Sequence, residues 1–274
     1  MPASPQRAIT REEITEYAEN GVVRLRKVFS ADWLDALRTG VEQALDSPGP
    51  HAEEYAGSGG RFFGDLDVSR RLDVFRDFVV NSPAAEIAGT IMGASRANFF
   101  YDQLLVKEPG TDDRTPWHQD QPYWAVSGEQ VASIWLPLDP VAKASSLQFV
   151  KGSHRWGEHN PHHFFDNTPY TGTGLPELPD IDANPDDHEI LAWDLEPGDC
   201  LVFQAMIVHG SAGNLSSEYR RRAWATRWTG DDARYCVRPG ETGYPIFDPG
   251  LKHGERMDCE AFPLVWQASG QSEA

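Results

Sequence analysis

The spacing of hydrophobic residues changes part-way along the chain. Over roughly the first 92 residues it is helical. One stripe is formed by Ile14, Tyr17 and Ala18, and a second follows the N-cap candidate Ser30 and contains Trp33, Leu34, Leu37, Val41 and Leu45. The alternating "GVVRLRKVF" between them predicts a short strand. Two more helices are predicted at about 70–77 and 82–92, the second starting at Asn81-Ser82-Pro83 and ending near Gly93.

Beyond residue 95 the pattern becomes that of short strands. The segments are rich in Val, Ile, Phe and Trp and are separated by Pro-Gly or Gly-Asp turns; they are "ANFFYDQLLVKEPG", "QVASIWLPLDPV", "SSLQFVKGSH", "HEILAWDLEPGDCLVFQAMIVHG" and "RRAWATRWTG". Strands that follow helices predict a mainly β sandwich or barrel with flanking helices.

We expect one domain over residues 1–274. Helices at about 10–92 would support a β core at about 95–230, and an irregular C-terminal extension would follow, with "FPLVW" packing on the barrel. The Gly-, Pro- and Ser-rich residues 46–60 predict a loop able to fold over a ligand.

The charge balance and the cysteines limit the partners and the compartment. With 42 acidic against 24 basic residues, the formal charge of −18 argues against nucleic acid or an anionic membrane as partner. No run of 18 apolar residues occurs, and "MPASPQRAITREE" lacks the apolar stretch of a secretory signal. The 3 separated cysteines form no C-x-x-C pair. We expect a cytoplasmic monomer or homodimer.

The stretch "TPWHQDQPYW" contains the first candidate metal ligands, His118 and Asp120. Side chains two positions apart on an extended strand point to the same face and can hold one cation together. A His-x-Asp pair alone is equally consistent with a turn histidine that is hydrogen-bonded to a neighbouring acid.

A second histidine favours the metal site. His209 follows an apolar strand in "EPGDCLVFQAMIVHGSAGN" and precedes small residues, as expected at the mouth of a barrel. Two imidazoles and one carboxylate form the facial triad that leaves coordination positions open on ferrous iron, whereas structural zinc prefers a closed tetrahedral shell.

Three arginines follow in "SSEYRRRAWATRW", and a guanidinium is a natural partner for a carboxylate bound beside a metal. If Arg221 faces inward, Ala223, Ala225 and Arg227 do too, which leaves small residues beside a bound acid. If Arg220 faces inward, Trp224 crowds the site. The alternation therefore favours Arg221 over Arg220, and at least one arginine of the group is expected to be solvated.

These motifs together resemble the phytanoyl-CoA dioxygenase family of non-haem iron, 2-oxoglutarate-dependent oxygenases. The resemblance rests on "WHQD", "SIWLPLDPV", "SSLQFVKGSHRWG" and "HGSAGNLSSEYRRRAWATRW", and "EYAENGVVRLRKVFSADWLDALRTGVEQAL" extends it over most of the chain. It implies a double-stranded β-helix, a cupin-like jelly roll.

The resemblance also implies roles for single residues. His118, Asp120 and His209 would hold Fe(II), and Arg220 or Arg221 would bind the distal carboxylate of 2-oxoglutarate. The spacing from His209 favours Arg220, whereas the match to "RAWATRW" favours Arg221.

Further candidates for contact with the cosubstrate are less specific. Lys107 and Gln103 share one face of the strand "YDQLLVKEP", although a strand-end lysine is often solvated. Trp135 would pack beside 2-oxoglutarate or simply in the core, and Ser211 would offer a hydroxyl or only form a turn.

The substrate candidates are the aromatic residues around the ligands. Trp117, Tyr123 and Trp124, with the loop at 55–63, suggest an aromatic-lined pocket, and their alternative role is ordinary packing. His154 is interpreted as a loop histidine and not as a metal ligand. It lies in "KGSH", where relatives often have Pro-Gly-Ser-His.

By resemblance, the expected reaction is hydroxylation of an unactivated C–H bond of a small organic molecule, a natural-product intermediate or an acyl-type substrate. Dioxygen would be consumed, and succinate and CO2 released. Asp120 argues against halogenation, because related halogenases have a small residue there. Desaturation, epoxidation and ring formation stay open. The alternative is a cupin-type metal-dependent isomerase or hydrolase, or a non-catalytic sugar or acid binder, on the same barrel. A cupin isomerase would not need the arginine group.

Overall fold

The structure is a computed structural model that describes residues 3–55, 60–164 and 167–269. Most strands belong to a large and a small antiparallel sheet. The large sheet has the order β1 (Val22–Leu25), β10 (Cys200–Gln204), β7 (Val131–Pro137), β12 (Arg221–Thr229), β4 (Arg96–Lys107), β3 (Phe62–Leu66) and β2 (Glu53–Glu54), and β14 (Leu264–Gln267) also pairs with β4.

The small sheet has the order β5 (Thr115–His118), β11 (His209–Ser211), β8 (Leu147–Val150) and β9 (Ile190–Leu191). A separate pair is formed by β6 (Val126–Ser127) and β13 (Arg234–Tyr235). From β4 to β12 the chain passes back and forth between the two sheets, which is the topology of a double-stranded β-helix. The predicted fold class is therefore confirmed.

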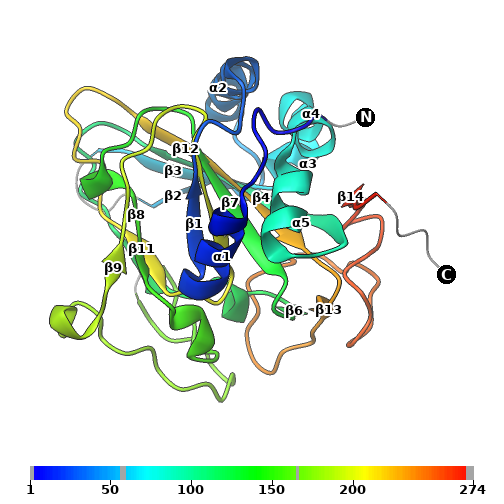
Figure 1. Cartoon of the computed structure of the whole chain (residues 1–274). Helices are drawn as coiled ribbons and strands as arrows, with labels where there is room; N and C mark the ends of the chain where they lie inside the picture. The colour runs from blue at the N-terminus through cyan, green and yellow to red at the C-terminus, as the bar shows by residue number, and fades with distance from the viewer. Residues whose placement is uncertain (1–2, 56–59, 165–166, 270–274) are drawn as a thin grey trace.

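Helices cover the outer face of the large sheet (Figure 1). They are α1 (Arg11–Asn20), α2 (Ala31–Asp46), α3 (Val68–Arg71), α4 (Asp73–Asn81) and α5 (Ala84–Met92). Among the described residues, short 3-10 helices lie between the strands at Gln121–Tyr123, Lys143–Ser145, Ser153–Arg155 and Pro185–Asp187. The Ser30 side chain accepts a hydrogen bond from the Trp33 amide, so the predicted N-cap is confirmed. The segment predicted as one helix at 70–77 is divided into α3 and α4.

The side chains of β12 alternate between two hydrophobic cores. Trp224 points outward and contacts the rings of Phe75 and Phe78, at centroid distances of 4.8 and 5.1 Å. Ala223 and Ala225 point inward, into a core that lies between the two sheets. This alternation fixes which arginines of the strand can reach the barrel interior.

The chain beyond β13 packs on the barrel. Tyr244 stacks on Tyr101 of β4 at 4.0 Å, and β14 pairs with β4, as "FPLVW" predicted. The predicted loop at 46–60 contains the short strand β2, and residues 56–59 lie outside the described residues. The three cysteines are free. In the part of the chain that the structure describes, no helix is long and apolar enough to cross a membrane.

Candidate metal centre

Two histidines face each other where β5 pairs with β11. β5 ends at His118, β11 begins at His209, and their Cα atoms are register partners. The ring centroids are 4.2 Å apart. His209 was predicted to close an apolar strand. It instead opens β11, because β10 ends at Gln204 in a turn where the Ile207 amide donates to the Gln204 carbonyl.

Asp120 completes the cluster from a turn. Its backbone is helical (φ −72°, ψ −48°), immediately before Gln121–Tyr123. The prediction that His118 and Asp120 share one strand is therefore wrong, because Pro122 favours the helical turn at this point. The carboxylate still reaches both rings: Asp120 Oδ1 lies 3.5 Å from His118 Nε2 and 3.9 Å from His209 Nε2.

Backbone carbonyls orient both imidazole rings. His118 Nδ1 lies 2.8 Å from the Pro116 carbonyl oxygen, and His209 Nδ1 lies 3.0 Å from the Ile207 carbonyl oxygen. A carbonyl only accepts, so each Nδ1 donates its proton and each Nε2 keeps a free lone pair on the side of Asp120. One ligand atom from each of the three residues lies within 4.8 Å of the others. The donor set fits an iron ion with open positions.

The protonation states suit metal binding. Burial, together with the nearby His118, lowers the pKa of His209 to about 4, so this ring is neutral near pH 7. Burial alone would raise the pKa of Asp120. The contact with His118 and the charges of His209 and Arg227 outweigh it and hold that pKa well below its usual range. The site therefore offers an ionised carboxylate and a neutral imidazole, the forms that bind cations.

Two residues behind Asp120 support it. Ser133 Oγ donates to Asp120 Oδ2 at 3.1 Å. Arg227, the register partner of Ser133 on β12, is 5% exposed and lies over the Tyr101 ring at 4.7 Å. Arg227 donates to Ala225 O and to Gln103 Oε1, at 3.0 and 3.1 Å. Its charge favours the ionised form of Asp120.

Arg221 and Lys107 form a buried pair of cations on the inner face of the large sheet. They are register partners between β12 and β4 and are 5% and 0% exposed. Arg221 donates to Ser145 O at 2.6 Å, and no carboxylate of the described residues lies within ion-pair distance of it. Lys107 Nζ donates to Asp113 O at 2.6 Å and lies 3.4 Å from Ser211 Oγ. We call these two residues the cation pair.

Burial and the neighbouring charge disfavour the charged forms of the cation pair. Burial, with Arg221 adding to it, lowers the pKa of Lys107 to about 6, and burial alone lowers the pKa of Arg221 to about 10. An anion bound between them would remove this penalty. The arrangement thus favours a small carboxylate at this end of the barrel.

The other residues named from the sequence have partners of their own. Arg220 lies on the outside and pairs with Glu108 at 2.9 Å and Glu42 at 3.2 Å. Trp135 is 2% exposed, and its ring is 6.0 Å from the Arg221 guanidinium. Gln103 is bound by Arg227, and Ser211 Oγ donates to Thr115 Oγ1 at 3.1 Å.

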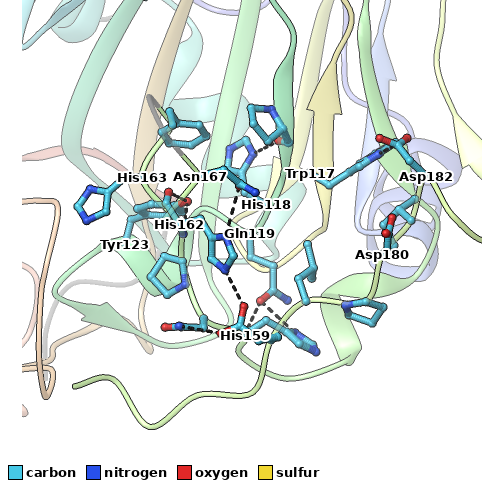
Figure 2. Close-up of a pocket in the computed structure, with 18 residues that line it drawn as sticks. Trp117, His118, Gln119, Tyr123, His159, His162, His163, Asn167, Asp180 and Asp182 are labelled. Carbon is cyan, nitrogen blue, oxygen red and sulfur yellow. Dashed lines mark hydrogen bonds and ion pairs between the residues drawn. The ribbon is translucent and has the colours of Figure 1, made fainter. Parts of the chain in front are cut away.

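A pocket of about 310 Å³ opens beside His118 (Figure 2). Residues 116–119, Tyr123, 159–164, Asn167 and 177–182 line it. Phe164 covers the edge of His118 at a ring distance of 4.9 Å and stacks on Tyr123 at 5.3 Å. The acidic side chains of the lining are Glu177, Asp180 and Asp182, and no lysine or arginine is among these described residues.

The three aromatic substrate candidates separate in the structure. Trp117 and Tyr123 line the pocket, and Trp117 Nε1 donates to Asp182 Oδ1 at 3.0 Å, as Figure 2 shows. Trp124 is 2% exposed and lies in a core cluster with Phe100 and Tyr101, away from the pocket lining. His154 lies in the 3-10 helix Ser153–Arg155.

The model of the family described as "Phytanoyl-CoA dioxygenase (PhyH)" matches residues 17–223 of the sequence. That stretch contains the whole His118, Asp120 and His209 cluster and the cation pair, and it is more than half of the chain. The chain belongs to the phytanoyl-CoA dioxygenase family.

Named relatives of this PhyH-family chain include oxygenases of small molecules. It is 22% identical to ectoine dioxygenase of Sphingopyxis alaskensis, over 79% of this chain and 74% of the relative. It is 30% identical to 1-deoxypentalenic acid 11-beta-hydroxylase of Streptomyces arenae, over 37% of this chain and only 35% of that relative's length.

Solved structures share the fold. The 2-oxoglutarate-dependent, non-heme carbocyclase SnoK of nogalamycin biosynthesis superposes with a TM-score of 0.76 at 21% identity. The superposition covers 97% of this PhyH-family chain and 100% of SnoK. EctD of S. alaskensis, solved with 2-oxoglutarate and 5-hydroxyectoine, gives a TM-score of 0.67 at 18% identity, over 93% of this chain and 88% of EctD.

Sequence reasoning about this PhyH-family chain missed several residues of the site. Ser133 and the stretch at 159–164 carried no signal, because a strand serine and a His-rich loop are ordinary features of a sequence. For Arg227, the alternation predicted the inward direction that it shares with Arg221 on β12, but not its role. Its place beside Asp120 follows from the register with Ser133, which a single sequence does not give.

Proposed function

We propose that this protein is an Fe(II)- and 2-oxoglutarate-dependent dioxygenase that hydroxylates an unactivated C–H bond of a small organic molecule. The observation that carries the proposal is the combination of two sites in one barrel. A facial triad of His118, Asp120 and His209 lies in the same interior as the cation pair. A cupin-type isomerase would not need this cation pair.

Each residue of the site would have a distinct part. His118, Asp120 and His209 would hold Fe(II) through Nε2 and carboxylate oxygen atoms. Bound iron, with 2-oxoglutarate as reducing cosubstrate, supplies the activation of dioxygen, and succinate and CO2 are released. Phe164 and Tyr123, which cover His118, would keep water from the reacting atoms.

The distal carboxylate of 2-oxoglutarate would bind the cation pair. Arg221 would offer its planar fork of donors, Lys107 a point charge, and Ser211 a hydroxyl beside Lys107. Trp135 would form the wall next to Arg221. Arg220 has two carboxylate partners on the outside, so Arg221 is the better anchor. Gln103 would act through Arg227 rather than on the cosubstrate.

The pocket chemistry supports a free small molecule as substrate. Acidic and aromatic side chains line it without a lysine or arginine among the described residues, so the phosphates of an acyl coenzyme A would find no partner. Trp117 and Tyr123 offer apolar faces to a neutral or cationic compound. The names of the relatives, a deoxypentalenic acid hydroxylase and an ectoine dioxygenase, describe substrates of that size.

The test mixes the protein anaerobically with Fe(II) and 2-oxoglutarate, and then admits air. The expected results are a weak visible charge-transfer band, followed by succinate. Candidate substrates are then screened by the succinate release that they stimulate. A protein that gives neither band nor succinate would refute the oxygenase. Binding of 2-oxoglutarate without succinate would instead favour the non-catalytic binder.

A further inference from the structure

Residues 235–244 lie beyond the family-matched stretch and run beside the metal centre. We call residues 120–126 the ligand turn and residues 157–164 the pocket loop. The Gly243 amide donates to the Tyr123 carbonyl at 2.7 Å, and the Ala125 amide donates to the Tyr244 carbonyl at 2.8 Å. The C-terminal segment is therefore bound along the ligand turn, within a few residues of Asp120.

Arg238 joins this segment to both neighbours. Its side chain is 8% exposed. Nε donates to Trp124 O, and Nη2 donates to Gln121 O and Val126 O at 3.1 and 3.0 Å, so one guanidinium gathers three carbonyls of the ligand turn. The same group forms a two-pronged ion pair with Glu158 of the pocket loop, at 3.0 and 2.7 Å.

The pocket loop bears directly on the metal centre. Phe164, at its end, contacts the His118 ring, and the His162 amide donates to the Tyr123 hydroxyl at 3.0 Å. Gln119 also holds the loop, from the other side: its side-chain amide donates to Gly157 O at 2.8 Å, and its side-chain carbonyl accepts from the His159 amide at 2.9 Å. The position of the loop therefore sets the shape of the pocket beside His118.

We propose that Arg238 is a substrate-positioning residue: its guanidinium holds the pocket loop against the ligand turn and so fixes the pocket wall relative to the metal. The kinetic part of this proposal rests on the oxygenase function proposed above. The structural part does not, because every contact that carries it lies within this chain.

The fork geometry explains why arginine is required. Turn carbonyls that are buried need donors, and the guanidinium of Arg238 supplies them from three separate nitrogen atoms. Nε and Nη2 donate to the turn, Nη1 donates to Glu158, and Nη2 also reaches Glu158 by sharing its two N–H groups among three acceptors. Lysine keeps the charge but has one donor atom, so it cannot reach both the turn and Glu158 in this geometry. Arg238→Lys is therefore a mild change that releases the loop.

The matched control is Arg96→Lys. Arg96 is 8% exposed and pairs with Asp258, so it also anchors the C-terminal extension, but its contacts lie far along the chain from the ligand turn. Amide hydrogen exchange of the metal-free proteins is measured first. Arg238→Lys is expected to speed exchange at 157–164 by about tenfold or more, and Arg96→Lys is expected to leave it unchanged.

The kinetic arm uses Fe(II), 2-oxoglutarate and the first compound that stimulates succinate release. Arg238→Lys is expected to raise the KM for that compound by about 10- to 100-fold, while kcat, the 2-oxoglutarate affinity and the charge-transfer band stay within twofold. Arg96→Lys is expected to keep the wild-type KM. Equal effects of the two variants on KM would refute positioning by Arg238.

A second variant protects the test against misfolding. Glu158→Gln removes the ion pair from the loop side and keeps the bonds of Arg238 to the ligand turn. It is expected to reproduce the faster exchange and the higher KM. Wild-type exchange at 157–164 in Glu158→Gln would overturn the proposal. A wild-type protein without band or succinate would instead refute the oxygenase function and leave the exchange result to decide the structural tie.

Discussion

The neighbouring arginines Arg220 and Arg221 give the sharpest test of the cosubstrate site. We compare Arg221→Leu with Arg220→Leu, because the two residues are adjacent in sequence but their side chains point in opposite directions, Arg221 into the barrel and Arg220 to its outside. Arg221 is 5% exposed inside the barrel, whereas the Arg220 side chain is 39% exposed and pairs with Glu42 and Glu108. Only Arg221→Leu should weaken the binding of 2-oxoglutarate.

The magnitude follows from the burial. Removing one member of a buried, hydrogen-bonded charge pair costs about 2–5 kcal/mol. Lys107 stays as a second cation, so we take about 3 kcal/mol, which weakens the Kd for 2-oxoglutarate about 100-fold. The exposed pairs of Arg220 contribute at most about 1 kcal/mol to folding, and none of it to this ligand.

The assay is anaerobic titration of 2-oxoglutarate into the Fe(II) protein, followed by the charge-transfer band, with thermal unfolding in parallel. Without ligand, Arg221→Leu should be no less stable than the wild type, because it removes a desolvated cation that has no carboxylate partner in the described chain. If Arg220→Leu lost affinity for 2-oxoglutarate and Arg221→Leu kept it, both the alternation argument and the binding of 2-oxoglutarate at Arg221 would be refuted.

Four further outcomes are expected. Since burial lowers the pKa of Lys107 from 10.5 to about 6, this amine is neutral above pH 6 in the free protein, and it takes up a proton when an anion binds. The affinity for 2-oxoglutarate should therefore fall as the pH rises above 6. Calorimetry should show no such dependence on pH in Lys107→Met. Asp120→Ala should give no band and no succinate, and an active variant would remove Asp120 from the metal shell. Trp224→Phe should cost about 1–3 kcal/mol in urea unfolding, because it leaves Asp102 Oδ1 without the indole donor, yet keep the 2-oxoglutarate Kd. Gly240→Ala should lower the melting temperature, because the new Cβ would lie 2.2 Å from Thr171 O at a φ of +76°; an unchanged temperature would contradict that geometry.

Local patterns were enough to predict the elements and much of the chemistry. The helical stripes and Ser30 indicated α2, and the change to short strands indicated the barrel. Parity along one strand was also reliable. Because successive side chains of β12 point to opposite faces, putting Trp224 outside required Arg221 to face inward.

Contacts between distant residues were not predictable from the same patterns. Asp120 lies in a helical turn, and Pro122 alone was not enough to predict that turn from the sequence. The pairing of His118 with His209 depends on a register across 91 positions of sequence, and the bond between Arg238 and the ligand turn spans more than 110. Such pairings are set by the tertiary packing of the whole barrel, and periodicity within a segment carries no information about them.

The position of the C-terminal segment bears on how this fold could vary its substrate. The triad and the cation pair lie within residues 17–223. His118, His209 and the cation pair are on strands whose register the large and small sheets fix, and Asp120 is in the turn that follows β5. The pocket wall depends instead on a loop and on a segment beyond that stretch, joined through Arg238 and Glu158. Changes in the loop can reshape the pocket without moving His118, His209 or the cation pair, since the strands hold these residues and loops determine the substrate. A swap of 157–164 and 235–244 together should therefore alter the substrate while 2-oxoglutarate affinity is kept, whereas a swap of the loop alone would break the tie at Arg238.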